Sequence, residues 1–289
     1  MKSSSTVFLA AFLALAASWA GFVLAPQIQL GRADQAKTIP AGDKYPVARP
    51  GLAAQGAEVY RSLGCVYCHS QQVSQQGVKV EVVLLDAGTN AAGVLAALGK
   101  INPALAIPEM LKGLPKAITT VADIPKSGDY VKAVTDAGGK IEVNIVPTGS
   151  DISRGWGKRR TVAQDYVYDS VVQIGTRRTG PDLANVGARL GDANWQMLHL
   201  YAPPAVLKDS TMPPYRFLFE KRKIGKTPSA DALKLTSEFA PPAGFEIVPT
   251  DKARELVAYL LSLRADAPLY ETPVTPPPAP APVTTAAAK

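Results

Sequence analysis

The stretch Gly64-Cys65-Val66-Tyr67-Cys68-His69 decides how this chain is interpreted. Two cysteines three positions apart, followed at once by a histidine, form the C-x-x-C-H pattern that attaches a c-type haem. The thiols of Cys65 and Cys68 would bond to the two vinyl groups of the porphyrin, and the imidazole of His69 would bind the iron. The alternatives are a redox dithiol, which needs no histidine at this place, and half of a zinc site. Zinc would need two further ligands, whereas His199 is the only other histidine and the chain has no further cysteine. The pattern therefore predicts one covalently attached haem c.

Length and charge limit the classes of protein that this chain can belong to. It has 289 residues, 47% of them hydrophobic, which is enough for one or two domains with real cores plus tails. Its net charge of +7 suits acidic partners or anionic lipid headgroups. The longest basic cluster, Lys158-Arg159-Arg160, is short and is not interleaved with stacking aromatic residues, so we expect no nucleic-acid binding.

The N-terminal stretch predicts a membrane anchor. Residues Val7 to Ala25 are apolar apart from Ser18. At about 1.5 Å of rise per residue, a helix over this range is roughly 28 Å long, close to the thickness of a hydrocarbon core. A cleaved signal peptide is the alternative, with Ser18-Trp19-Ala20 as its cleavage site. Because the apolar run continues beyond this site to Leu24, the sequence favours an uncleaved anchor that exports the rest of the chain.

An electron-transfer haem usually has a sixth iron ligand, most often the thioether of a methionine. The best candidate is Met212, because Pro213 follows it within a run that prevents a helix and favours a rigid loop. Met197 lies in an apolar helical pattern where a methionine normally fills the core, and Met110 lies in a region of different character. His199 is the other candidate ligand.

Two helices are predicted around the haem motif. One runs from about Leu52 to Leu63 and leads into the motif. The other covers residues 251–263, has its apolar residues on one face, and begins after the plausible N-cap Thr250. Gly56 on the first helix would let the second cross it closely. This arrangement resembles class I cytochromes c, whose first and last helices cross in that way.

Three longer blocks carry a closer resemblance. They are Gly64 to Val73 around the haem motif, Gly175-Thr176-Arg177-Arg178-Thr179-Gly180-Pro181-Asp182-Leu183 with its continuation to Gly187, and Ser210-Thr211-Met212-Pro213-Pro214-Tyr215. Together with the segment that contains Trp195 and His199, they resemble the mono-haem subunit II of cbb3-type cytochrome c oxidases, the FixO family.

The resemblance implies roles for several residues. Cys65, Cys68, His69 and Met212 would hold the haem, and the carbonyl group of Pro181 would orient the imidazole of His69. Arg177 and Arg178 would lie near the haem propionates, although both also suit an exposed surface.

The resemblance also implies a function. The protein would be a single-pass subunit of a bacterial inner membrane, with its haem domain on the periplasmic side. It would pass electrons from periplasmic cytochrome donors to the haem–copper catalytic subunit, beside the other oxidase subunits, and would perform no bond chemistry itself. The alternative is a free-standing, membrane-anchored cytochrome c that serves other periplasmic partners.

Residues 78–146 depart from that family, which continues directly from Val73 toward the Arg177 block. The pattern predicts a β-α-α-β-α-β order and resembles the C-terminal domain of the bacterial ribosomal stalk protein. The positions that match its factor-binding residues are Ala91, Ala96 and Gly99, which speaks against factor binding. We interpret the segment either as a scaffold for protein–protein contacts or as a neutral insertion. The predicted strands are 78–85, 116–121 and 140–145, and the predicted helices are 90–98, 108–113 and 129–137.

The sequence as a whole predicts a mainly α protein in which the small α/β segment interrupts a class I cytochrome c-like domain. The C-terminal stretch is rich in proline and alanine and predicts a disordered tail. The expected parts are the anchor at 1–25, a linker at 26–50, the haem domain at 51–77 and 147–264, the α/β segment at 78–146 and the tail at 265–289.

Overall fold

The structure, a computed structural model, describes residues 3–30, 35–49, 51–121, 123–236 and 238–272. The chain divides into two compact units. The first comprises Met1–Gln71 with Thr161–Glu271, and the second comprises Gln72–Arg160 with Thr272–Lys289. The second unit is therefore wider than the predicted segment 78–146.

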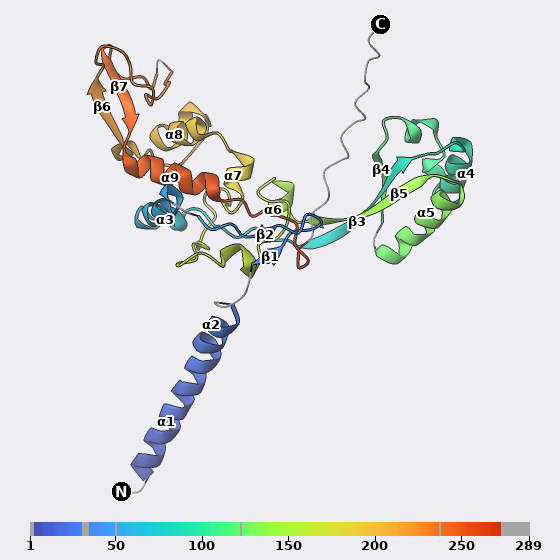
Figure 1. Cartoon of the computed structure of the whole chain (residues 1–289), viewed down its shortest axis with the longest axis horizontal. Coiled ribbons are helices and arrows are strands. Elements are labelled where there is room, and N and C mark those ends of the chain that lie inside the picture. The colour runs from blue at the N-terminus through green and yellow to red at the C-terminus, as the bar shows by residue number, and fades with distance from the viewer. Residues whose placement is uncertain (1–2, 31–34, 50, 122, 237, 273–289) are drawn as a thin grey trace. The chain divides into compact units, whose positions relative to one another are not determined.

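The N-terminus forms one long apolar helix, drawn in dark blue in Figure 1. Within Ser4–Gln29, a window of 18 residues has a mean hydropathy of 2.3, and the helix is long and apolar enough to cross a membrane. The helix consists of α1 (Ser3–Trp19), a π-helical turn at Ala20–Leu24, and α2 (Ala25–Leu30). Pro26 gives a physical reason for the turn, because it has no N–H group to offer to the carbonyl four residues earlier.

The segment predicted as a linker packs against the first unit instead. Strands β1 (Ala36–Lys37) and β2 (Lys44–Tyr45) pair antiparallel. The hydroxyl group of Tyr45 donates to Oδ1 of Asp165 at 2.7 Å, and Arg49 forms an ion pair with Asp169. The linker prediction is thus wrong for residues 35–49. The prolines suggested an extended linker, but Tyr45 and Arg49 hold this stretch against the rest of the unit.

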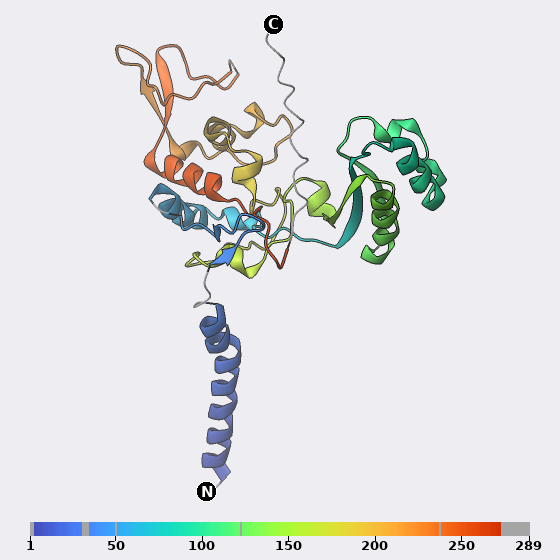
Figure 2. The same ribbon diagram turned by 45° about the vertical axis from the view of Figure 1, so that its right-hand side comes forward.

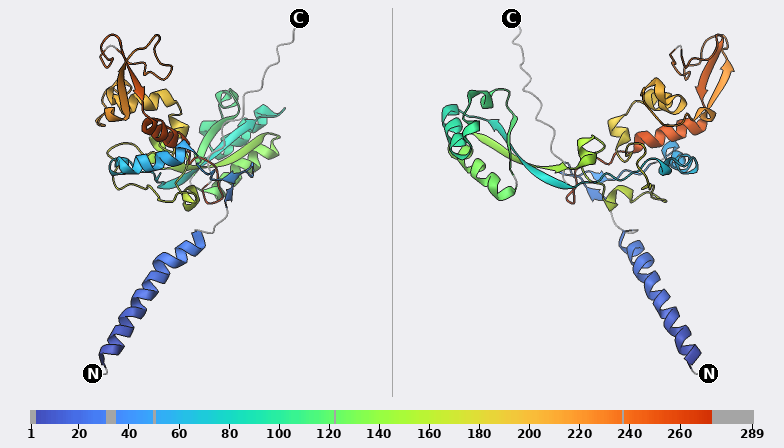
Figure 3. Two further views of the ribbon diagram at one scale, coloured as in Figure 1. Left: turned by 60° about the vertical axis from the view of Figure 1, so that its left-hand side comes forward. Right: turned by 180° about the vertical axis from the view of Figure 1, so that it is seen from behind.

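The first unit is built around two helices that cross at a glycine. A Cβ atom on Gly56 of α3 would lie 1.9 Å from the carbonyl oxygen of Glu255 on α9, so only glycine allows this approach. The left view of Figure 3 looks nearly along α9 and shows α3 from the side. Thr250 caps α9 by accepting a hydrogen bond from the backbone N–H of Ala253. Besides α1 and α2, the α-helices of this unit are α3 (Leu52–Ser62), α7 (Val186–Arg189), α8 (Ala193–Tyr201) and α9 (Asp251–Ser262).

The remaining elements of the first unit close its core around α9. The backbone N–H of Gly187 donates to the carbonyl of Leu263 at 2.9 Å, which brings α7 against the end of α9. Leu256 and Leu260 of α9 are buried in the same core as Leu200 of α8. The short helices are η2 (Cys65–Tyr67), η5 (Ala163–Tyr166), η6 (Pro203–Ala205) and η7 (Arg216–Leu218), and the antiparallel strands are β6 (Phe219–Lys223) and β7 (Phe245–Pro249).

The second unit is a three-stranded antiparallel sheet in the order β4-β3-β5. Helices α4 and α5 cover one face, where the core contains Val82 and Leu84 from the sheet and Val94 and Val134 from the helices. Figure 2 shows both helices beside the sheet. The elements are β3 (Gly77–Asp86), α4 (Ala91–Ile101), η3 (Pro103–Leu105), η4 (Pro108–Leu111), β4 (Lys116–Val121), α5 (Ile124–Asp136), β5 (Lys140–Thr148) and α6 (Ser150–Ser153).

Two elements of this unit differ from the expectation. The helix expected at 108–113 is the short 3-10 helix η4, and Gly113 has a φ of 70° beyond its end. The helix expected at 129–137 begins earlier, at Ile124, because the side chain of Asp123 accepts a hydrogen bond from the N–H of Lys126 and caps it.

The predicted tail begins later than its composition suggested. Leu269 is fully buried, and the backbone N–H of Ala265 donates to the carbonyl of Ala184 at 3.1 Å. The prediction of disorder is therefore wrong for 265–272, where an apolar residue precedes the proline-rich stretch. Residues 273–289 lie outside the described part of the chain.

Candidate functional site

The C-x-x-C-H stretch forms a tight turn at the end of α3. Gly64 has a φ of 71°, a left-handed conformation that favours glycine, and it starts the short helix η2. The backbone N–H groups of Cys68 and His69 both donate to the carbonyl of Cys65, at 3.2 and 3.0 Å. The turn thus holds the two thiols and the imidazole next to one another on one short segment.

The imidazole of His69 lies against the backbone of the Gly180–Pro181 segment. Its Nδ1 atom is 2.8 Å from the carbonyl oxygen of Pro181. A Cβ atom on Gly180 would lie 2.2 Å from Cε1 of the ring, so no side chain fits at this position. The burial of His69 lowers the pKa of its ring, and the carbonyl of Pro181 opposes this shift. A neutral ring that donates from Nδ1 keeps the lone pair of Nε2 for a metal.

An apolar cavity opens beside this histidine. Together with the open space at its mouth, it has an empty volume of about 560 Å³. The predicted ligands Cys65, His69 and Met212 all contribute to its wall, whereas Cys68 is exposed. The lining consists of Tyr60, Cys65, His69, Pro181, Leu183, Val186, Arg189, Leu190, Trp195, Gln196, His199, Leu200, Met212, Leu256 and Leu260.

The three candidate methionines have different surroundings. Among them, Met212 is the one that lines the cavity. Met197 packs against the core of the first unit, and Met110 packs against the core of the second unit. The backbone N–H of Met212 donates to Oγ of Ser210 at 3.3 Å, which helps to hold the loop. The geometry therefore favours Met212 over the other two.

His199 lines the same cavity and is the other candidate ligand. Its ring stacks on Trp195 with 4.8 Å between the ring centroids. Within the described part of the chain, its Nδ1 atom is buried without a hydrogen-bond partner. Burial lowers the pKa of His199, and the nearby His69 lowers it further. This neutral imidazole has a nitrogen that could contact a bound group.

The two arginines expected near the haem propionates are exposed. Arg177 and Arg178 do not line the cavity, and their place relative to a haem stays a prediction. Arg178 instead donates from Nε to Oγ of Ser70 at 3.0 Å. Arg189, which sequence reasoning missed, lines the cavity, and its Nε atom is buried with no hydrogen-bond partner among the described residues. It lies two residues beyond the end of the block from Gly175 to Gly187, and this proximity was the available signal.

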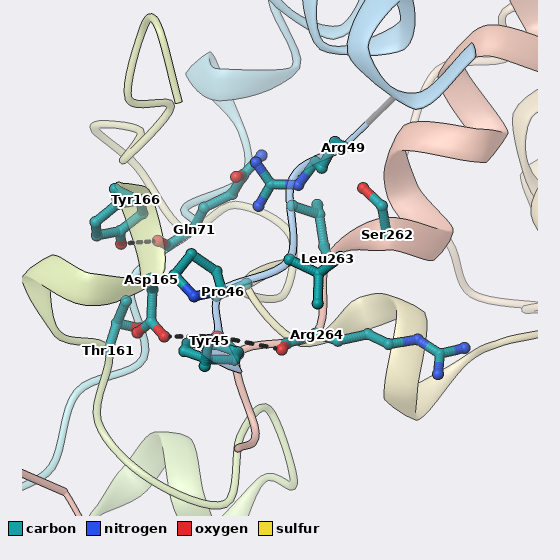
Figure 4. A pocket seen from close by; sticks show the side chains of 13 residues that line it. Tyr45, Pro46, Arg49, Gln71, Thr161, Asp165, Tyr166, Ser262, Leu263 and Arg264 are labelled. Atoms are coloured by element: carbon teal, nitrogen blue, oxygen red, sulfur yellow. Dashed lines mark hydrogen bonds between the residues drawn. The ribbon is translucent and has the colours of Figure 1, made fainter. Parts of the chain in front are cut away.

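Residues 45–49 contribute to a second cavity of the first unit, which is drawn in Figure 4. Arg49 and Gln71 contribute to its wall, and the hydroxyl group of Tyr45 reaches toward Asp165 and the carbonyl of Arg264. The buried Gln71 accepts a hydrogen bond from the hydroxyl group of Tyr259 at 3.1 Å. The cavity is therefore the place where residues 45–49 pack against the rest of the first unit.

The residues of the first cavity fit a covalently attached haem. A thiol and an imidazole stand at its wall, a methionine is available, and the rest of the lining is mostly apolar. The buried Nε of Arg189 and Nδ1 of His199 are suited to a polar edge such as that of the haem propionates. By contrast, the described residues contain no group of three or more His, Cys, Asp or Glu that could hold a metal ion, so they offer no support for a zinc site.

A comparison with protein families agrees with this chemistry. Residues 144–258 match the family model of the cytochrome c oxidase mono-heme subunit, FixO. The match includes Pro181, Arg189 and Met212 and ends before the close of α9. It does not include the C-x-x-C-H stretch, so the two observations are independent. No curated protein matches the chain. The resemblance of residues 78–146 to the ribosomal stalk domain therefore stays a prediction.

Proposed function

We propose that this protein is the membrane-anchored, mono-haem c-type cytochrome subunit of a cbb3-type oxidase. The family match implies a mono-haem oxidase subunit, and the apolar helix at Ser4–Gln29 fits an anchor. The observation that carries the proposal is the placement of His69. Its imidazole is hydrogen-bonded to Pro181, lies against Gly180, and borders the cavity that Met212 also lines.

Each residue would have a distinct role toward the haem. Cys65 and Cys68 would attach it covalently, and His69 and Met212 would be the residues that bind its iron. The crossing of α3 and α9 and the turn that follows α3 support a class I cytochrome c fold for this unit. The bound haem would supply a site that takes up and releases one electron. The apolar residues that surround the cavity would exclude water and so tune that site.

The place of the protein follows from the anchor. The helix would hold the haem domain on the periplasmic side, where covalent attachment takes place, beside the haem–copper subunit that receives the electron. The donor would be a periplasmic cytochrome. A free-standing anchored cytochrome with the same haem is the competing interpretation, and the two differ in what the protein binds.

Purification in a mild detergent tests this proposal. We expect the haem protein to leave the membrane in a complex far larger than 30.4 kDa, with a haem–copper subunit and oxygen-reductase activity. Cutting the chain after Leu30 should release a haem domain that is reduced by a chemical donor but no longer supports oxygen consumption. A monomer with no haem–copper subunit, from native membranes, would establish the free-standing cytochrome instead.

A further inference from the structure

The buried carboxylate of Asp182 lies close to the imidazole of His69 and to its partner Pro181. Ser70 directly follows His69, and Asp182 directly follows Pro181. The hydroxyl group of Ser70 donates to Oδ2 of Asp182 at 2.6 Å, and the backbone N–H of Leu183 donates to the carbonyl of Ser70 at 2.8 Å. Asp182 is 0% exposed and Ser70 is 5% exposed. The two segments that hold the imidazole are thus fastened together at an acidic group.

Two arginines accompany this carboxylate. Arg178 donates from Nε to Oγ of Ser70 at 3.0 Å, and its Nη2 atom is 3.9 Å from Oδ2 of Asp182. The side chain of Arg178 is 34% exposed, so it lies between the buried acid and solvent. The other oxygen, Oδ1, accepts from the N–H of Ala184 at 2.9 Å. Arg189 donates to the backbone carbonyl of Asp182 at 2.8 Å.

The cluster lies directly beside the imidazole. Ser70 follows His69 in the chain, and Asp182 follows Pro181, whose carbonyl oxygen is 2.8 Å from Nδ1 of His69. A charge held beside a residue that binds iron changes the ease of adding an electron at that iron, because the added electron changes the local charge. A buried site screens such charges less than water does.

We infer that Asp182 and Arg178 form a charge pair that sets the reduction potential of the haem through His69, which rests on the function proposed above. Uptake of one electron removes one unit of positive charge from the site. The fixed anion of Asp182 disfavours that loss and lowers the potential, whereas the cation of Arg178 favours it and raises the potential. Both are positioning residues, since neither contacts the cavity.

The two members of the pair can be tested by the direction of their effects. Asp182→Asn keeps the shape and one acceptor oxygen but removes the negative charge, so the midpoint potential should rise. Arg178→Gln removes one positive charge beside Asp182, so the potential should fall. Arg178→Lys keeps the charge and should restore most of the fall. The potentials are measured by spectroelectrochemical titration of the full-length protein in detergent.

A purely structural role would give a different pattern. If the cluster only holds His69 in place, both charge-removing variants would shift the potential in the same direction, or both would lose the spectrum of a six-coordinate haem. Either result, or no shift in either variant, overturns the inference. Arg61→Gln is the matched control, because Arg61 is a half-exposed arginine of the same unit that pairs with Glu58. Its potential should equal that of the wild type.

The same experiment separates this inference from the proposed function. If the wild-type protein carries no covalent haem, the proposed function fails before any potential is measured. If the wild type carries haem and Asp182→Asn does not, the midpoint potentials of Arg178→Gln and Arg178→Lys still test whether the charge of Arg178 acts on the haem. Equal potentials for those two variants overturn the charge pair, and a lower potential for the glutamine variant supports it.

Discussion

At the residue scale, the candidate site depends on the contact between the imidazole ring of His69 and Gly180. Because a side chain at Gly180 would collide with the imidazole of His69, this position must be empty for the ring to reach Pro181. The glycine therefore has a steric role, whereas Pro181 supplies a hydrogen-bond acceptor. Both residues stand in one short block of the sequence, and the structure brings that block to the haem motif.

Adding one methyl group at this glycine should damage the site. Gly180→Ala would place a Cβ atom 2.2 Å from the ring, so either the imidazole or the loop must move. We expect a large loss of haem incorporation, measured as haem absorbance per chain. Gly225→Ala is the control, because nothing lies within 4 Å of a Cβ atom there and the same unit contains it. Equal haem content in the two variants would contradict the proposed position of His69.

The sixth ligand can be tested by removing its sulfur. The oxidised protein should show the weak sulfur-to-iron charge-transfer band at the red edge of the visible spectrum. Met212→Ala should abolish this band and lower the midpoint potential, because a thioether favours the ferrous state. Persistence of the band in the variant would move the assignment to Met197 or Met110. A wild-type spectrum without the band would favour His199.

The parts of the site that the sequence predicted are those with a local motif. The C-x-x-C-H turn and the methionine before two prolines are visible in a few consecutive residues, and the structure brings them to one cavity. Arg189 was missed because its position at the cavity wall depends on the orientation of the four-residue helix α7, which no local motif predicts. The contact of Arg178 with Ser70 could not be predicted from a local motif, because it joins residues 108 positions apart in the chain.

Periodic patterns at the element scale predicted the helices better than the connections. The helix at α9 was visible from its apolar face and its N-cap, and the structure has both. The stretches 35–49 and 265–272 carry prolines and little periodicity, so their composition suggested a linker and a tail. Tyr45, Arg49 and Leu269 pack nonetheless, because single long-range contacts decide the conformation of such stretches.

The helix crossing should be sensitive to the size of residue 56. Gly56→Ala would put a Cβ atom 1.9 Å from the carbonyl oxygen of Glu255, and the helices would have to separate. We expect a loss of about 1–3 kcal/mol in the free energy of unfolding, as for other overpacked cores. Gly128→Ala on α5 has open space around its Cβ atom and should be neutral or slightly stabilising. Denaturant unfolding of both variants measures the difference.

The loop between β6 and β7 should become less firmly held in acid. The carboxylate of Glu246 accepts from the N–H of Ser229 at 2.7 Å and from Nε of Arg222 at 2.8 Å, and these bonds lower its pKa. Because the folded-state pKa is below the usual value of about 4.3, the stabilisation is present above that pH and is lost as the pH falls through the lowered pKa.

A variant checks the sign of this effect. Glu246→Gln should melt at a lower temperature than the wild type near neutral pH, and the gap should narrow below about pH 4. Thermal unfolding at several pH values measures it. A gap that stays constant or widens in acid would show that the charge of Glu246 does not contribute in the expected direction.

The sheet of the second unit begins and ends at two neighbouring residues. Strands β3 and β5 pair in a register that places Gly77 opposite Thr148, and the N–H of Gln76 donates to the carbonyl of Thr148 at 2.9 Å. A short loop could therefore replace everything between them. None of the residues that line the cavity beside His69 belongs to the second unit.

Removing this sheet and its two helices should leave the proposed haem site intact. Replacing residues 78–147 with a short Gly/Ser turn keeps the Gly77–Thr148 pair, so we expect normal haem attachment and the Met212 band. The absorption spectrum of the deletion protein measures both. Loss of the spectrum would show that the unit is needed to form the haem domain. An intact spectrum with reduced oxidase assembly would indicate a scaffold for contacts.

The central claim at the scale of the whole molecule is that one haem is attached covalently to this chain. The most direct measurement is the intact mass of the denatured protein after expression with the haem-attachment machinery, followed by mapping of the modified peptide. We predict a mass increase equal to one haem, located on Cys65 and Cys68 and absent from a Cys65→Ala/Cys68→Ala double variant. An unmodified mass with two free thiols in the wild-type protein would contradict the account.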